Sequence, residues 1–202
     1  MPRYRTRSWR AFEPGAAAGA RPAPTANLRI LGLDPGSQRT GFGLIDCRGT
    51  DYVHVAHGCI TAPGATLAGR LRAIFEAVQA LIAEHRPDEI AIERVFVSRN
   101  VDSALKLGQA RGAALSAVPP EISVFEYAPR AIKLAVVGFG AAEKAQVAHM
   151  VKALLRLDGR IAADASDALA IAICHAHARG LHRLAYAAAG GGAAPLAGDA
   201  HG

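Results

Sequence analysis

The 202-residue sequence lacks the features of a disulfide-bonded or membrane-spanning protein. It holds only three cysteines, Cys47, Cys59 and Cys174, with no C-x-x-C pair. An odd number without such a pair favours a reducing compartment and gives no zinc motif. No run of about 18 apolar residues is present, and the Arg-rich N-terminus has no apolar signal core. We therefore expect a cytoplasmic protein with no membrane association.

Aromatic residues are also scarce, and the charge is unevenly distributed. Aromatics make up 5% of the chain against 51% hydrophobic residues overall, so the core must consist mainly of Ala, Leu, Ile and Val. Residues 1–27 carry five Arg and one Glu, residues 187–202 carry a single Asp, and residues 28–186 therefore carry +3 of the total +6. A mildly basic body with a more basic arm fits a polyanionic partner.

The two ends of the chain differ in composition from the middle. Residues 11–26 and 187–202 are dominated by Ala, Gly and Pro, and such segments bury too little surface to offset chain entropy. We predict a disordered basic arm over 1–27, a single folded domain over 28–186 and a disordered Ala/Gly-rich tail over 187–202.

Within the middle segment, hydrophobic periodicity predicts strands first and helices later. Strands are expected over 28–34, 40–47, 52–61, 89–95 and 122–127, and helices over 67–86, 101–118, 142–157 and 163–179. The last helix is expected to end at Gly180, with Arg179 near its negative terminus. This order indicates an α/β protein with an antiparallel edge, in which the first and fourth strands are central neighbours.

Four carboxylates occupy positions that suit a metal site. Asp34 ends the first strand, Glu93 follows three apolar residues of the fourth, and Asp164 and Asp167 lie three apart at the start of the last helix. An i, i+3 pair projects from one helix face, and open α/β sheets bind ligands at the carboxyl edge. All-oxygen clusters suit Mg²⁺ or Mn²⁺. Two such ions about 3.5–4 Å apart can hold the attacking and leaving oxygens of a phosphodiester.

Taken singly, each acid has a simpler explanation. Asp34 before Pro35 and Gly36 is a common turn opener. Asp164 and Asp167 can serve only as cap and dipole partners of a helix. Glu93 is harder to explain, because it stands in what should be a buried strand. Their joint placement favours a metal-dependent nuclease.

Several segments, in this order and spacing, resemble the RuvC family of Holliday junction resolvases. They are GLDPGS (32–37), TGFG (40–43), AIERVF (91–96), the run 100–112, EYAPR (126–130), AEK (142–144) and ADASDALA (163–170). The resemblance covers roughly residues 28–184. Some members have His at the last acidic position, where this chain has Asp167. The 27-residue leader departs from the family pattern.

The resemblance implies a ribonuclease H-like fold: a mixed five-stranded sheet flanked by helices in a single domain. It implies a homodimer that nicks two like-polarity strands of four-way junction DNA symmetrically, giving 5′-phosphate and 3′-hydroxyl ends in recombination and repair. Asp34, Glu93, Asp164 and Asp167 correspond to the catalytic, metal-binding acids. The implied cofactor is Mg²⁺, two per active site, with Mn²⁺ as a substitute. The implied protein partners are RuvA and RuvB.

Five further residues are candidates for DNA contact. By resemblance Phe96 wedges against bases at the branch point, which suits an aromatic facing unstacked bases; alternatively it closes the core under a polar loop. Lys133 and Lys144 match basic residues near the scissile phosphate, and the alternative is that both are solvated helix lysines. Lys144 at a helix start is misplaced for the helix dipole. Arg94 and Arg99 flank the same edge and are expected to position the DNA backbone.

Three other functions are alternatives to a junction resolvase. They are a nuclease for RNA–DNA hybrid or precursor RNA, an actin-like or sugar-kinase-like nucleotide binder, and a catalytically inactive junction-binding scaffold. The nucleotide binder needs two such domains, and the complete set of acids argues against the scaffold. His175 and His177 face different sides of the last helix and are expected to be bystanders.

Overall fold

The computed structural model describes residues 27–48, 51–61, 66–94 and 101–188. The strands are β1 (Asn27–Asp34), β2 (Arg39–Arg48), β3 (Asp51–Thr61), β4 (Glu89–Glu93) and β5 (Ser123–Tyr127). The helices are α1 (Leu67–His85), α2 (Val101–Ser116), α3 (Pro129–Val137), α4 (Lys144–Leu155) and α5 (Ala163–Ala188). Residues 1–26 of the predicted arm and 189–202 of the predicted tail lie outside the described residues, whereas Asn27 begins β1 and residues 187–188 belong to α5.

The strands form one mixed sheet in the order β3-β2-β1-β4-β5. β1 pairs antiparallel with β2, and β2 pairs antiparallel with β3. β4 is parallel to β1, with Leu33 opposite Ile92, and β5 is parallel to β4. The predicted antiparallel edge and the predicted pairing of the first and fourth strands are both confirmed. Asp34 and Glu93 are the next residues along each strand, so they leave the sheet at the same edge.

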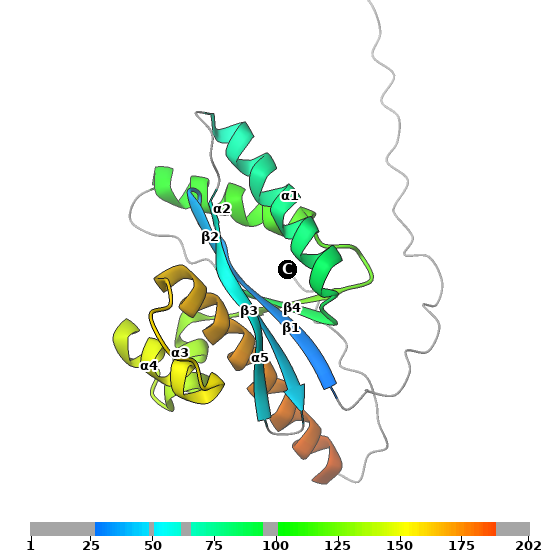
Figure 1. Cartoon of the computed structure of the whole chain (residues 1–202), viewed down its shortest axis with the longest axis vertical. Coiled ribbons are helices and arrows are strands. Elements are labelled where there is room, and N and C mark those ends of the chain that lie inside the picture. Colours follow the sequence, from blue (N-terminus) through cyan, green and yellow to red (C-terminus); the bar gives the residue numbers. More distant parts are fainter. Residues whose placement is uncertain (1–26, 49–50, 62–65, 95–100, 189–202) are drawn as a thin grey trace, which may run out of the picture.

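Helices cover both faces of the sheet (Figure 1). α3, α4 and α5 pack on one face, where Ile30 of β1 joins a core cluster built mainly from these helices. α1 and α2 pack on the other face, where Leu31 and Leu33 of β1 belong to a second cluster. The alternation follows from the period of two in a strand. By the same alternation, Asp34 shares the α5 face with Ile30.

Two glycines let α5 lie directly on the strands. A Cβ at Gly32 of β1 would overlap the backbone carbonyl of Ala168, and a Cβ at Gly41 of β2 would overlap that of Asp164. Any larger residue would therefore push the helix away from the sheet. The first turn of α5, with its acids, is held against the ends of β1 and β2 because these positions carry no side chain.

One helix that the sequence analysis did not predict, and two helix boundaries that differ from the predicted ones, have clear physical reasons. α3 was not predicted, although Pro129 at its start and Gly138 in the left-handed conformation at its end are ordinary helix signals. α4 begins at Lys144, two residues later than expected, because Glu143 and Gln146 form a capping box. α5 continues past Gly180 to Ala188, since one interior glycine costs about 1 kcal/mol and the Ala-rich sequence beyond it is strongly helical.

Across the part of the chain that the structure describes, none of the helices combines the length and apolarity needed to cross a bilayer.

Candidate active site

The site begins at the ends of the two central strands. Asp34 is the last residue of β1 and Glu93 the last of β4, and both are partly buried. Glu93 stands opposite Tyr127 of β5 in the parallel ladder. The apolar residues before each acid, Leu33 and Ile92, are fully buried. The strands therefore hold the two carboxylates at the border between the core and solvent.

α5 brings the other two acids to the same edge. Asp164 lies in its first turn, and Asp167 follows one turn later on the same face. The charges of Asp167, Glu93 and Asp164 all act on Asp34. Four carboxylates from two strands and one helix therefore converge, as their spacing in the sequence predicted.

The convergence changes the acidity of the cluster. Burial, followed by repulsion from Asp167 and Glu93, raises the pKa of Asp34 from 3.8 to about 7. The pKa of Glu93 is also raised, first by burial and then by repulsion from Asp167. Positively charged groups nearby lower the free-energy cost of keeping these carboxylates ionised in the folded protein.

Three basic side chains supply part of that charge. Lys144 Nζ donates to Asp167 Oδ2 at 3.0 Å, which raises the pKa of the lysine. Its position at the start of α4 is therefore explained by this carboxylate and not by the helix dipole. Arg39 Nε lies 3.0 Å from Asp164 Oδ2. Lys133 on α3 is half-buried, and its charge lowers the pKa of Glu93.

An arginine on α2 supports the end of β4 from the side. Arg111 Nη1 donates to the backbone carbonyl of Glu93 at 2.6 Å, and its Nη2 donates to Glu126. Arg94 Nε lies 3.8 Å from the same Glu126 carboxylate. The guanidinium of Arg111 is 12% exposed, so it serves as an internal brace and is not available for DNA.

Arg39 and Arg111 were missed by the sequence reasoning. For Arg39 the available signal was its place at the start of the strand that folds back along Asp34. For Arg111 it was a single charge among the small residues of α2. Both contacts depend on distant segments, so spacing alone did not reveal them.

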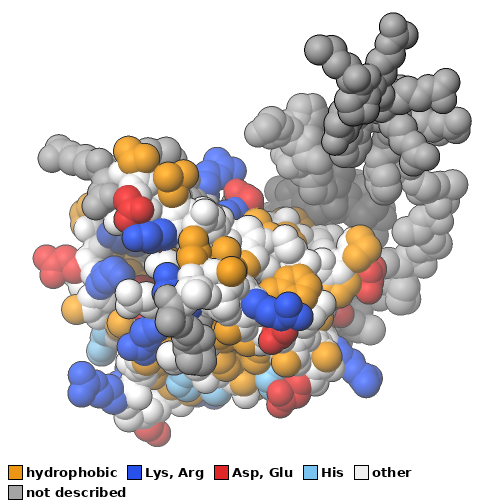
Figure 2. Space-filling view, turned by 90° about the horizontal axis from the view of Figure 1, so that it is seen from above, with side chains coloured by type: hydrophobic (Ala, Val, Ile, Leu, Met, Phe, Trp, Pro, Cys, Tyr) orange, Lys and Arg blue, Asp and Glu red, His pale blue; other side chains and the backbone are white. Residues whose placement is uncertain are grey.

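The predicted DNA-contact residues divide into two groups. Lys133, Lys144 and Arg94 lie around the acids as expected, although Arg94 is paired with Glu126. Phe96 and Arg99 lie outside the described residues, so their predicted roles stay predictions. Figure 2, seen from above the view of Figure 1, shows Lys and Arg side chains spread over this face among acidic and apolar ones.

The donor set fits a hard divalent cation, and its present arrangement is not closed around one. Among the residues that the structure describes, no three His, Cys, Asp or Glu side chains meet closely enough to hold an ion. Asp164 and Asp167 are instead turned toward Arg39 and Lys144. Carboxylate oxygens are the ligands that Mg²⁺ and Mn²⁺ prefer, and the pKa of Asp34 is raised first by burial and then by repulsion from Asp167 and Glu93, which a bound cation would offset.

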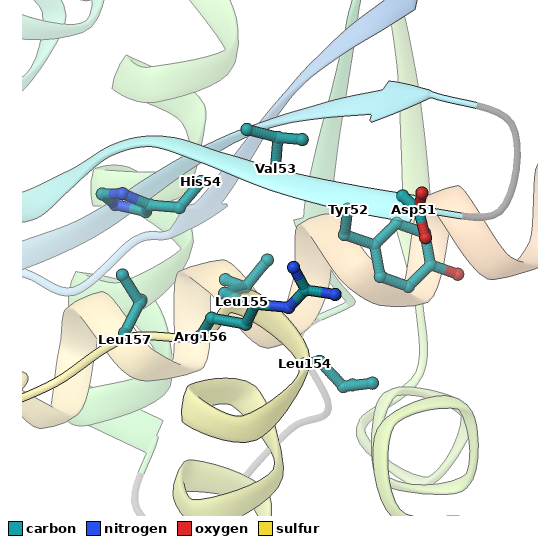
Figure 3. A pocket seen from close by; sticks show the side chains of 8 residues that line it. All are labelled: Asp51, Tyr52, Val53, His54, Leu154, Leu155, Arg156 and Leu157. Carbon is teal, nitrogen blue, oxygen red and sulfur yellow. The ribbon is translucent and has the colours of Figure 1, made fainter.

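One cavity lies far from the acids. It has a volume of about 530 Å³ and lies between β3 and the end of α4, lined in part by Tyr52, Leu155 and Arg156 (Figure 3). Asp51, which lines this cavity, stands opposite Arg48 in the ladder between β2 and β3. This end of the sheet is the one opposite Asp34. The cavity is therefore separate from the acid cluster.

A mixed five-stranded sheet with acids at the ends of β1 and β4 and on a helix crossing the same face defines the ribonuclease H-like class of nucleases. The family model for crossover junction endodeoxyribonuclease RuvC matches residues 30–175. The chain belongs to this RuvC family, which consists of metal-dependent nucleases, and the resemblance predicted from the sequence is confirmed.

Individual relatives agree with this assignment. The chain is 55% identical over 150 residues to crossover junction endodeoxyribonuclease RuvC of Alkalilimnicola ehrlichii, covering 74% of this chain and 91% of the relative. It is 52% identical to the protein of the same name from Shewanella baltica, covering 73% of this chain and 86% of that one.

Solved structures agree as well. T. thermophilus RuvC, in complex with Holliday junction substrate, superposes with a TM-score of 0.72 at 30% identity, over 77% of this chain and 96% of that chain. The yeast mitochondrial Holliday junction resolvase Ydc2 shares the fold, with a TM-score of 0.58 at 10% identity over 80% of this chain and 86% of that one.

Proposed function

We propose that this protein is a Holliday junction resolvase that uses Asp34, Glu93, Asp164 and Asp167 to cut four-way junction DNA. The observation that carries the proposal is the convergence of these four carboxylates at one sheet edge in a chain of the RuvC family. The products are 5′-phosphate and 3′-hydroxyl ends on two strands of like polarity, which a ligase can join directly.

The proposed cofactor is Mg²⁺, two ions per active site, with Mn²⁺ as a substitute. Ions held there would supply Lewis-acid activation of water and charge stabilisation at the leaving oxygen. Asp34, on which all three other acids act, would be one of the residues that hold them. Glu93, held by the brace from Arg111, and the two α5 acids complete the set.

The basic residues have a second role in this proposal. Bound cations would compete with Lys144 for Asp167 and with Arg39 for Asp164. Both side chains, together with Lys133, lie at the edge where a phosphate group would enter. A lysine that neutralises the acids before substrate binding can thus stabilise negative charge on the phosphate afterwards.

A homodimer is part of the proposal, because a four-way junction has two-fold symmetry and an isologous dimer places two sites on it. Val101 and Leu105, one turn apart on α2, are 66% and 62% exposed in the isolated chain. Light scattering of the purified protein tests whether it forms a dimer.

Partnership with RuvA and RuvB, implied by the family, is tested by co-sedimentation on junction DNA. The proposed location is the cytoplasm.

The decisive experiment compares three labelled substrates with and without Mg²⁺. They are a synthetic immobile four-way junction, the matching linear duplex and an RNA–DNA hybrid. We expect paired nicks in the junction only, at symmetric positions and only with the metal. Preferential cutting of the hybrid would replace the proposal by the alternative nuclease function. Junction binding without cutting under all metal conditions would leave only a scaffold.

A further inference from the structure

A buried polar cluster lies at the start of β4 and near the middle of α5, the strand and the helix that carry three of the acids. His175 on α5 is 1% exposed and Glu89 at the start of β4 is 4% exposed. His175 Nε2 is 2.7 Å from Glu89 Oε2, and its Nδ1 is 2.6 Å from the Tyr127 hydroxyl. Arg179, one turn further along α5, places Nη2 2.9 Å from Glu89 Oε1. His175, which was expected to be a bystander of the metal site, is thus a hydrogen-bonded member of a buried cluster.

The four side chains satisfy one another. With the proton on Nε2, neutral His175 donates to Glu89 and accepts from the Tyr127 hydroxyl. Glu89 also accepts from Arg179, which balances its charge. Because α5 continues to Ala188, the expectation that Arg179 lies near the end of the helix is wrong. The Phe125 ring stacks on the imidazole at a centroid distance of 4.4 Å and limits its rotation. Removing one member would leave a buried polar group without its partner.

These bonds are directional and tie the middle of α5 to β4 and β5, as the Arg39–Asp164 ion pair ties its first turn to β2. Between them the contact with the sheet is apolar, with Ala168 and Ala172 against Gly32 and Leu169 against Gly43. Apolar burial is roughly proportional to area and has no preferred direction. The Glu89–His175 bond instead specifies one position of the helix along β4.

That position is coupled to the acids by matched spacings. Glu89 and Glu93 are four residues apart on the same face of β4, about 13 Å at 3.3 Å per residue. His175 and Asp167 are eight residues apart on α5, about 12 Å at 1.5 Å per residue. Fixing His175 beside Glu89 therefore fixes Asp167 beside Glu93. The repulsion from Asp167 at Glu93 agrees with this placement.

We propose that Glu89, His175, Tyr127 and Arg179 form a positioning cluster, which sets the register of α5 on β4 and so the separation of Asp164 and Asp167 from Asp34 and Glu93. None of the four touches the reacting atoms. The inference rests on the proposed function, because it assumes that the four acids bind metal together. It adds that their geometry is set from a site about 12 Å away.

Two substitutions of His175 separate the two hydrogen bonds. The amide of His175→Gln reaches the place of Nε2 and can still donate to Glu89, whereas that of His175→Asn reaches only the place of Nδ1. Mn²⁺ binding to the full-length protein, measured by titration calorimetry without DNA, reports on the acids directly. We expect His175→Asn to weaken Mn²⁺ binding by about 2- to 30-fold, and His175→Gln to retain most of the affinity. Tyr127→Phe, a milder change, should weaken it less than His175→Asn.

A matched control distinguishes positioning from general loss of stability. Val78 on α1 is fully buried on the opposite face of the sheet, so Val78→Ala should lower the melting temperature without moving α5. The inference predicts unchanged Mn²⁺ affinity for Val78→Ala and unchanged junction affinity in EDTA for every variant. Equal losses of Mn²⁺ affinity in Val78→Ala and His175→Asn would overturn it, as would wild-type affinity in His175→Asn. A wild-type protein that binds no Mn²⁺ would instead refute the proposed function.

Discussion

Replacing Asp34 by Asn should stabilise the metal-free protein at alkaline pH and not at acidic pH. Asp34 is held between Glu93, Asp167 and Asp164, and its pKa is about 7 when folded against 3.8 as the ordinary value. A carboxyl whose pKa rises on folding favours the folded state below the unfolded value. That contribution is lost as the pH rises from about 4 through about 7. The amide of the Asp34→Asn variant has no proton to lose, so the variant escapes this penalty.

The size of the effect follows from the two pKa values. They differ by about 3, which corresponds to roughly 4 kcal/mol at about 1.36 kcal/mol for each unit of pKa. The repulsion is shared with Glu93 and Asp167, and the edge of the sheet is open to water, so about 2 kcal/mol is the expected gain at high pH. In a domain of this size that corresponds to a rise in melting temperature of about 4–8 °C.

The assay is thermal unfolding of wild type and Asp34→Asn in EDTA, from pH 5 to pH 8.5. The two melting temperatures should diverge as the pH rises and approach each other as it falls. Added Mg²⁺ should raise the melting temperature of the wild type most at high pH, where protons do not compete, and that of the variant much less. A difference that is independent of pH, or a variant less stable than wild type at pH 8.5, would refute the account of the acid cluster.

Three other changes give distinct outcomes. Lys133→Ala and Lys144→Ala should slow single-turnover cleavage more than they weaken junction binding, and equal losses in both assays would make them ordinary backbone contacts. Phe96→Ala should weaken the junction complex by about 5- to 150-fold through lost stacking, with melting temperature and Mn²⁺ binding unchanged. A fall in stability of about 3–5 kcal/mol with normal cutting would place Phe96 in the core instead. Deleting residues 1–26 should preserve folding, dimer and cleavage, and loss of soluble protein would show that the arm is structural.

The order and pairing of the strands and helices could be predicted because they follow from the local periodicity of hydrophobic residues. Alternation identified the strands, and the apolar runs before Asp34 and Glu93 indicated central parallel neighbours, as observed. The acids could be placed because strand ends and a helix start have fixed geometry. By contrast, the prediction that the last helix ends at Gly180 was wrong, because the residues around this glycine favour a helix.

The partners of the acids could not be predicted in the same way. Arg39 with Asp164, Arg111 with the carbonyl of Glu93, and Lys144 with Asp167 join segments that only the folded chain brings together. Each is a side-chain contact across elements, and no periodicity reports it. The sequence showed that Lys144 lies at the helix end where the dipole disfavours a cation. It did not show that the carboxylate of Asp167 is its partner.

The same limit applies to the buried cluster around His175. Its partners Tyr127 and Glu89 are 48 and 86 residues away in the sequence. The sequence shows only a histidine within an apolar helix, which is compatible with a bystander. Only the pairing of β4 and β5 beneath α5 makes the three groups neighbours.

The most direct test of the central claim is cleavage of an immobile four-way junction by Glu93→Gln, under single-turnover conditions with Mg²⁺. The substitution removes one ligand charge at nearly constant shape, so cleavage should be abolished while junction affinity in EDTA and folding are preserved. Glu84→Gln, the same change at an exposed position near the end of α1, which precedes the start of β4 and not its catalytic end, should cut like wild type. Mg²⁺-dependent cleavage by Glu93→Gln at a rate near that of wild type would contradict the assignment of the active site.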